Sequence, residues 1–236
     1  MCTVSFVHVN DTIIITSNRD EKVVRPSAIP PKEYTINGTN VIFPKDPKAG
    51  GTWFAVAANG TVLVLLNGAD EKHKVALPYR KSRGLIVLDI ISRVSPKDFW
   101  AEIDLENIEP FTLVLFQESA LFQLRWNGKE KVSIPLDIHK NHVWSSSTLY
   151  PAAIREKRTN WFYTFLNANP AISETEMLHF HRYTEEDNQE NGLVINRNEQ
   201  MKTLSITQSV IEKNKVAILH CDLIAQKEYK TSFITI

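Results

Sequence analysis

The second residue of the chain is a cysteine, Cys2, placed directly after Met1. A residue this small permits removal of the methionine, and the mature chain would then begin with a thiol and a free α-amine on one Cα. An α-amine titrates near pH ~7.7–8.0, so part of it is an unprotonated base at neutral pH. A thiol needs such a base, or a nearby cation, to become a thiolate. Cys2 therefore has the chemistry of a nucleophile that carries its own base, as a terminal threonine does.

A second stretch with chemical potential is Ser-Asn-Arg-Asp-Glu at residues 17–21, where the second strand is expected to end. Residues 9–12 are typical of a tight turn between two apolar strands, and the resulting hairpin would bring this stretch back beside Cys2. Arg19 would then favour the thiolate, and Asp20 would orient the terminal amine. The alternatives are a buried apolar cysteine and a solvated strand end with an ordinary ion pair.

Acyl transfer by a thiolate also needs hydrogen-bond donors aimed at the developing oxyanion. Asn67 is the best candidate donor, because it stands where an apolar strand ends and Gly68 follows. An ordinary Asn-Gly turn is the alternative. We further expect Asn18 and Trp53 to contact the substrate.

The elements that must position these residues begin with two hairpins. Residues 2–9 and 12–18 form the expected first hairpin, and Asn59-Gly60 marks the turn of a second. Residues 62–66 are apolar without alternation, so both faces of that strand should be buried. A sheet buried on both faces requires layers on either side of it.

The rest of the chain is expected to add two loops, four helices and further strands. The loops are expected at residues 25–51, around a short strand at 41–43, and at residues 184–200, a polar and mobile segment. The helices are expected at residues 83–94, from Ser95-Pro96 onward, at 151–166 and at 173–181. The later strands are expected at residues 111–116, 121–126, 132–134, 203–211, 215–220 and 229–236. This order predicts an α+β fold, a four-layer αββα sandwich of two antiparallel sheets flanked by helices, with residues 1–236 as a single domain.

A chain that opens with Met-Cys and carries Asn-Arg-Asp-Glu at residues 18–21 resembles the NRDE-motif family, the transport-and-Golgi-organisation type two proteins. More distantly, it is similar to the choloylglycine hydrolase and penicillin V acylase branch of the N-terminal nucleophile hydrolases. Further matching stretches occur in order at residues 25–26, 50–53, 65–67, 79–84, 144–147 and 204–207. The resemblance implies the N-terminal nucleophile hydrolase fold over essentially the whole chain, and it implies Asn67 as part of the oxyanion hole.

The chain departs from the resembled hydrolases at two places. Residues 144–148 read Trp-Ser-Ser-Ser-Thr, with serine where those hydrolases have an asparagine. A serine hydroxyl can donate a hydrogen bond, but over a shorter reach. Lys202 stands near the place of a late arginine in the bile-salt-cleaving relatives, and it cannot make the same forked contact.

Composition argues against several classes of function. Lys plus Arg equals Asp plus Glu at 27 each, so there is no overall field to attract nucleic acid. No apolar run approaches the ~20 residues of a membrane-spanning helix, and no signal peptide is visible, so we expect a cytoplasmic protein. Two cysteines and eight glycines predict no disulfide framework, no metal site and no cofactor-binding phosphate loop. The basic cluster at residues 72–83 is interpreted first as a solvated connection and second as the rim of an anionic-ligand site.

Two hypotheses of function follow. The first is a cysteine N-terminal nucleophile amidohydrolase, active after Met1 removal on a linear C–N amide of a small molecule; an acyltransferase differs only in what resolves the thioester. The second is a non-catalytic binding or carrier protein on the same fold. For this role the resemblance implies a haem-like or lipid-like ligand, since NRDE-motif proteins have been connected with haem and lipid handling. The sequence leaves the oligomeric state open.

Overall fold

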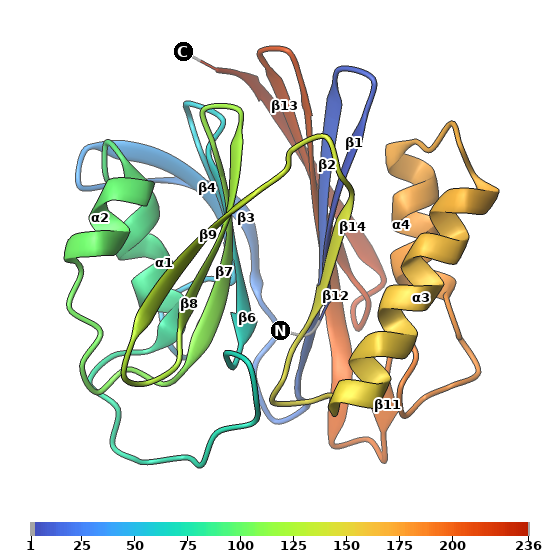
Figure 1. Cartoon of the computed structure of the whole chain (residues 1–236), viewed down its shortest axis with the longest axis horizontal. Coiled ribbons are helices and arrows are strands. Elements are labelled where there is room, and N and C mark those ends of the chain that lie inside the picture. The colour runs from blue at the N-terminus through green and yellow to red at the C-terminus, as the bar shows by residue number, and fades with distance from the viewer. Residues whose placement is uncertain (1–2, 236) are drawn as a thin grey trace.

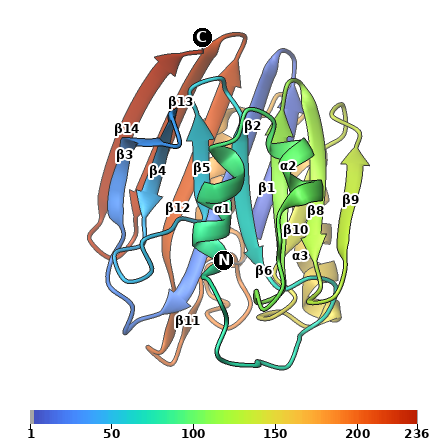
Figure 2. The same cartoon turned by 90° about the vertical axis from the view of Figure 1, so that its left-hand side faces the viewer.

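The structure is a computed structural model that describes residues 3–235. Within this range, two seven-stranded antiparallel sheets pack face to face, and helices cover the outer face of each (Figure 1). The predicted four-layer α+β sandwich is therefore confirmed. Figure 2 shows the same layers from the side on which α1 and α2 cover one sheet.

The first sheet has the strand order β10-β1-β2-β12-β13-β14, with the short β11 beside β12. Its strands are β1 (Thr3–Val9), β2 (Thr12–Lys22), β10 (His142–Ser145), β11 (Asn196–Arg197), β12 (Met201–Glu212), β13 (Lys215–Asp222) and β14 (Lys227–Ile234). The predicted first hairpin is confirmed, since Thr3 of β1 pairs with Asn18 of β2 and Val9 pairs with Thr12. β10 was not predicted, and it pairs with the other edge of β1.

The second sheet is a simple meander from β3 to β9. Its strands are β3 (Ile29–Ile36), β4 (Thr39–Lys45), β5 (Phe54–Ala57), β6 (Val62–Asn67), β7 (Phe111–Gln117), β8 (Ala120–Trp126) and β9 (Lys131–Leu136). Val62–Leu66 are buried on both faces, as their unbroken apolar run predicted. The helix layer on one side and the first sheet on the other enclose them.

The helices follow their expected signals. Helices α1 (Arg83–Ile91) and α2 (Pro96–Glu102) cover the second sheet, and α3 (Ala152–Ala168) and α4 (Glu174–Tyr183) cover the first. Ser95 caps α2 by accepting a hydrogen bond from the Asp98 backbone N–H, with Pro96 in the first turn. Ser173 and Glu176 form the predicted capping box of α4.

Two expectations for the connections were wrong, and a third missed a short strand. The second strand does not end at residues 17–21 but continues to Lys22, because β12 pairs with it over that whole length. Residues 25–51 are not a long loop, since β3 and β4 form a hairpin around Asn37-Gly38; the short strand predicted at residues 41–43 is confirmed as part of β4. The prolines of β3 fit because it is an edge strand with an irregular register, where a missing N–H breaks no ladder. Residues 184–200 include β11 and are anchored by side chains such as that of the buried Leu193.

Side chains on the first sheet alternate between the two neighbouring layers. Val4 and Phe6 of β1 belong to the core between the sheets, whereas Val7 packs with Phe162 and Phe180 of α3 and α4. The same alternation on β2 decides which residues of the Asn-Arg-Asp-Glu stretch can share one site.

Candidate active site

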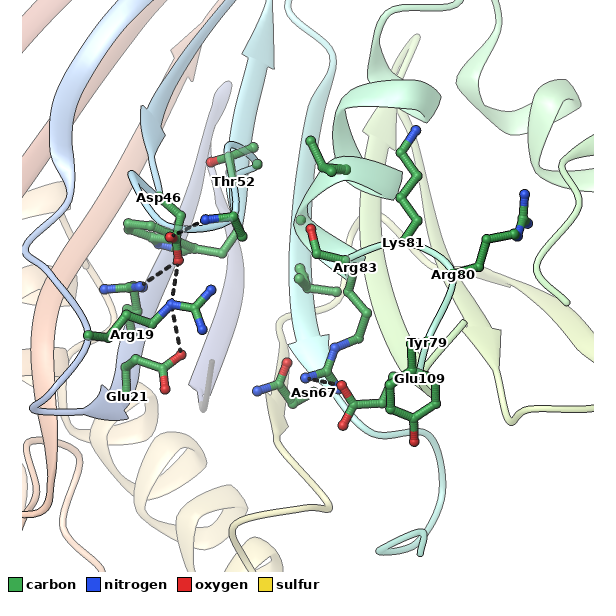
Figure 3. A pocket seen from close by; sticks show the side chains of 18 of the residues that line it. Arg19, Glu21, Asp46, Thr52, Asn67, Tyr79, Arg80, Lys81, Arg83 and Glu109 are labelled. Atoms are coloured by element: carbon green, nitrogen blue, oxygen red, sulfur yellow. Dashed lines mark hydrogen bonds and ion pairs between the residues drawn. The ribbon is translucent and has the colours of Figure 1, made fainter. Parts of the chain in front are cut away.

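A cavity of about 670 Å³ opens at one end of the sandwich, lined by β2, the β4–β5 connection, the end of β6 and the segment that leads into α1. Two walls face each other across it (Figure 3). One wall carries Arg19, Glu21, Asp46 and Thr52, and the other carries Asn67, Tyr79, Arg83 and Glu109. Its volume falls within the range of ~300–1,000 Å³ that is usual for small-molecule sites.

The first wall is built around a buried carboxylate. Asp46 Oδ2 accepts hydrogen bonds from Arg19 Nη2 at 3.1 Å and from Arg25 Nε at 2.7 Å. Its other oxygen accepts from the backbone N–H groups of Lys48 and Ala49. Burial works to raise the pKa of Asp46, but the N–H of Ala49 and the two guanidinium groups outweigh it, so the pKa is lowered. Asp46 is therefore a fixed anion that holds both arginines in place.

Arg19 is only 3% exposed and is held by contacts on two sides. Its guanidinium carbon lies 4.2 Å from the ring centroid of Trp53, so a cation–π contact adds to the ion pair with Asp46. Burial lowers the pKa of Arg19, and the charges of Glu21 and Asp46 oppose that shift. The contact also places the indole of Trp53 in the cavity wall.

The second wall is organised by Arg83 at the start of α1. Arg83 Nη2 pairs with Glu109 Oε2 at 2.9 Å, and Glu109 Oε1 lies 3.2 Å from His73 Nε2. Burial lowers the pKa of Arg83, against the opposing charge of Glu109. Arg80 and Lys81 also line the cavity, each paired with an aspartate. Part of the basic cluster thus lines the cavity, and its interpretation as the rim of an anionic-ligand site stays a prediction.

Two glycines allow the walls to approach each other. A Cβ added at Gly51 would lie 2.3 Å from the backbone carbon of Gly84, and the Thr52 backbone N–H donates to the Gly84 carbonyl at 3.1 Å. The chain before β5 and the first turn of α1 are therefore in backbone contact. Only glycine permits this approach, which fixes the width of the cavity.

Asn67 ends β6 and lines the cavity. Ser146 Oγ donates to the Asn67 backbone carbonyl at 2.8 Å. Gly68 follows with φ of +83°, and a Cβ there would lie 2.3 Å from Ser147 Oγ. The serine stretch that replaces an expected asparagine therefore packs against the main chain beside Asn67 and supports its position.

Asn18 and Asp20 lie on the opposite face of β2 from Arg19. Asn18 Nδ2 donates to the backbone carbonyls of His181 and Leu193, and its Oδ1 meets His181 Nδ1. Asn18 Oδ1 can only accept, so His181 carries its proton on Nδ1 and accepts at Nε2 from Ser5 Oγ, 2.7 Å away. Burial lowers the pKa of His181 to about 3, so this buried trio joins the first sheet to α4 with a neutral imidazole.

Asp20 is 2% exposed and is held by two hydroxyl groups. Its carboxylate accepts from Tyr150 Oη at 2.7 Å and from Thr203 Oγ1 at 2.6 Å. The guanidinium carbon of Arg158 lies 3.5 Å from the Tyr150 ring centroid, and Arg158 Nη1 donates to Thr3 Oγ1 at 2.5 Å. This network fixes the first described residue of β1 to α3.

Of the six predicted site residues, the structure brings three to the cavity: Arg19, Trp53 and Asn67. Asn18 and Asp20 are absent from the described lining, and Cys2 lies outside the described residues. Sequence reasoning missed Asp46 and Glu109, which reach the site only through the fold. The stretches at residues 25–26, 50–53 and 79–84 did carry a signal, since all of them contribute to the cavity.

The described residues hold neither a metal-binding cluster nor a membrane-spanning helix. No group of three or more His, Cys, Asp or Glu side chains within residues 3–235 is arranged to hold a metal ion. Over the same described range, no helix is long and apolar enough to cross a membrane.

Solved structures with this architecture show which fold the chain has. An N-acylethanolamine-hydrolyzing acid amidase ortholog of Caenorhabditis elegans is similar over 88% of this chain and 92% of that chain, with a TM-score of 0.63 and 11% identity. A mutant and a variant of conjugated bile acid hydrolase from Clostridium perfringens are similar over 100% of this chain and 97% of theirs, with TM-scores of 0.60 and 0.55 and 9% identity. The mutant has alanine in place of a cysteine at its second position. The fold is therefore that of the N-terminal nucleophile hydrolases.

The sequence model of one family, Transport and Golgi organisation 2, matches residues 1–236, and the chain belongs to this family. The resemblance found in the sequence is thereby confirmed. Comparison with curated protein sequences gave no match.

Proposed function

We propose that the chain is a cysteine N-terminal nucleophile amidohydrolase that cleaves a linear C–N amide after removal of Met1. One observation carries the proposal: β1 begins at Thr3, and the neighbouring strand places the buried guanidinium of Arg19 in a cavity that also holds the side chain of Asn67. A cysteine at the second position of conjugated bile acid hydrolase, a protein of the same fold, is consistent with this role.

In the proposed reaction, Cys2 Sγ attacks the amide carbonyl carbon and its proton passes to the α-amine, directly or through one water. The tetrahedral intermediate collapses as the C–N bond breaks, and the leaving amine takes that proton. A thioester between Cys2 and the acyl group remains. Water then adds to the thioester, releasing the acid and restoring the thiol.

Asn67 and Arg19 have different roles in this scheme. The Asn67 carboxamide donates to the oxyanion together with a backbone N–H, an interaction that strengthens as charge develops on the oxygen. Arg19 supplies a fixed positive charge that favours the thiolate, and Asp46 and Trp53 hold it rigidly. Trp53 also provides an apolar surface for the substrate.

Asp20 orients the terminal amine in our proposal. The hydroxyl groups of Tyr150 and Thr203 hold its carboxylate oxygens in place. Asn18 pairs with Thr3 and has a supporting role in our proposal. It fixes β2 by donating to the backbone carbonyls of His181 and Leu193. Its side chain lies on the face of β2 opposite Arg19, and this position does not support the direct substrate contact that we expected.

The test begins with the two thiols of the chain. Cys221 is 1% exposed, and burial raises its pKa to about 11, so it should resist alkylation at neutral pH. Iodoacetamide labelling of the native protein should therefore modify Cys2 alone, with a pH midpoint below that of an ordinary thiol. Intact mass before labelling reports whether Met1 has been removed.

Activity is then tested on a panel of N-acyl amides. Cys2→Ser should lower turnover by several orders of magnitude with the urea midpoint unchanged, while Cys221→Ser, the matched control, should keep full turnover. Retained Met1, or equal turnover of the Cys2→Ser variant, would refute the proposal that the chain is a cysteine N-terminal nucleophile amidohydrolase. Tight stoichiometric haemin or lipid binding that depends on Cys2, without turnover, would instead establish the carrier.

A further inference from the structure

A separate, smaller cavity of about 180 Å³ lies beside the end of β6, with residues of β8, β10 and α3 in its lining. Leu66 and Gly68 contribute to its lining, so it adjoins the main chain of Asn67 from the side away from the candidate active site. Its polar lining includes Thr112, Arg125, Ser145, Ser147, Arg155 and Thr159. The volume is several times the ~30 Å³ that one water molecule occupies in the liquid.

Two arginines from different elements meet at this cavity. Arg125 comes from β8 and Arg155 from α3. The Nε atom of each is buried without a hydrogen-bond partner among residues 3–235. An unpaired buried donor costs about 1–3 kcal/mol, and more when it is charged, so the protein alone leaves both guanidinium groups of this cavity lining incompletely satisfied.

The charges point to an acceptor that is an anion. Arg125 Nη1 pairs with Asp70, whereas Arg155 makes no ion pair within the described residues. Two guanidinium groups against one carboxylate leave one positive charge, and no Asp or Glu of residues 3–235 lines the cavity. Like charges at a shared cavity repel each other, and an anion between them removes that cost.

The hydroxyl groups at the cavity supply few further donors. Thr112 Oγ1 donates to the Gly68 carbonyl, Thr159 Oγ1 to the Arg155 carbonyl and Ser147 Oγ to the Glu71 carbonyl. These three hydroxyl hydrogens are already used, so Ser145 and Gln123 can add neutral donors, and the two guanidinium groups supply the charged ones. Planar guanidinium forks match the oxygens of a phosphoryl, sulfate or carboxylate group.

We propose that this cavity is a binding site for a small tetrahedral oxyanion, either free phosphate or the phosphoryl group of a small metabolite, held between Arg125 and Arg155. The ligand competes with Asp70 for Arg125. Asp70 belongs to the segment that leads from β6 to the residues 77–85 of the active-site lining. Ligand binding that displaces Asp70 from Arg125 would therefore free one contact of that segment.

Isothermal titration calorimetry on the full chain, at low chloride, tests the proposal with sodium phosphate and with glycerol phosphate. We expect saturable one-to-one binding that Arg155→Gln weakens at least tenfold. Lys157→Gln, which removes the same charge from an exposed position of the same helix, should leave the affinity unchanged. Asp70→Asn should tighten binding because it releases Arg125, and a merely structural role of the pair cannot produce that gain.

The two ligands separate the two sources of the oxyanion. Equal affinity for both identifies the free ion as sufficient, and tighter binding of glycerol phosphate identifies a phosphoryl-bearing metabolite. Absence of saturable binding for both ligands, or equal weakening by Arg155→Gln and Lys157→Gln, would overturn the proposal.

Discussion

Replacing Asp46 by alanine removes the carboxylate that organises one wall of the candidate active site (Figure 3). In the wild-type chain this side chain is 9% exposed and that of Arg19 is 4% exposed, so the ion pair between them is buried. Arg25 shares the same carboxylate oxygen but is 29% exposed, and water can replace part of its contact. The main consequence of the substitution is an unpaired guanidinium at Arg19.

Removing one partner of a buried ion pair costs roughly 3–5 kcal/mol, because the remaining charge stays desolvated. We expect a loss in that range for Asp46→Ala, since the backbone N–H groups of Lys48 and Ala49 also lose their acceptor. Asp46→Asn keeps an oxygen for those N–H groups and should cost less. Asp104→Ala is the matched control: its ion pair with Arg80 is exposed and should contribute about 0–1 kcal/mol.

Urea unfolding at neutral pH measures these differences, and a pH series adds a second check. The pKa of Asp46 is lowered from 3.8 by folding, so its contribution is complete above pH 3.8 and is lost as the pH falls through the folded value. The stability difference between wild type and Asp46→Asn should therefore be full at pH 5 and shrink toward pH 3. A cost for Asp46→Ala no larger than that of Asp104→Ala would refute the reasoning.

Three further predictions concern other parts of the fold. His181→Gln should reduce the loss of stability on acidification. The pKa of wild-type His181 is about 3 in the folded chain and 6.5 in the unfolded chain, so the free energy of unfolding falls by up to about 1.4 kcal/mol per pH unit below pH 6.5. Urea unfolding at pH 7 and pH 5 measures this slope. Gly51→Ala should cost about 3 kcal/mol or more and slow labelling of the Cys2 thiol, because the added Cβ would overlap the Gly84 backbone. Gly38→Ala is the control: its Cβ would have nothing within 4 Å, so it should cost about 1–2 kcal/mol and leave labelling unchanged. Asn67→Ala should lower kcat on a cleaved amide by about 10²–10³-fold with the urea midpoint unchanged, and unchanged kcat would remove Asn67 from the oxyanion hole.

The fold was predictable where local signals and burial agree. The turn at Asn59-Gly60, the capping box at Ser173 and the unbroken apolar run Val62–Leu66 each determine an element without help from distant residues. The hairpin at Asn37-Gly38 carries the same dipeptide signal, but the flanking prolines pointed to a loop. An edge strand tolerates those prolines, and edge position is a property of the assembled sheet that the local sequence does not contain.

The candidate site was predictable only in part, for a related reason. Arg19 and Asn67 were found because each stands near a recognisable strand and a motif. Asp46 follows β4 in a turn whose pattern is that of an ordinary Asx turn, and Glu109 precedes β7 with no motif at all. Asp46 pairs with Arg19, and Glu109 pairs with Arg83. These partners are far apart in the sequence, and only the packing of the two sheets and α1 brings them together.

The Asn-Arg-Asp-Glu stretch illustrates why sequence proximity is a poor guide to a shared site. In a β-strand, neighbouring side chains point to opposite faces, so Arg19 and Glu21 reach the cavity while Asn18 and Asp20 reach the helix layer. One strand thus serves two layers: one face lines the cavity, and the other anchors α3 and α4 and carries Asp20, for which we propose the role of orienting the terminal amine. Substitutions at alternate positions should therefore separate: Arg19→Leu should impair thiol reactivity at the cavity, whereas Asn18→Leu should lower the free energy of unfolding through its lost bonds to His181 and Leu193.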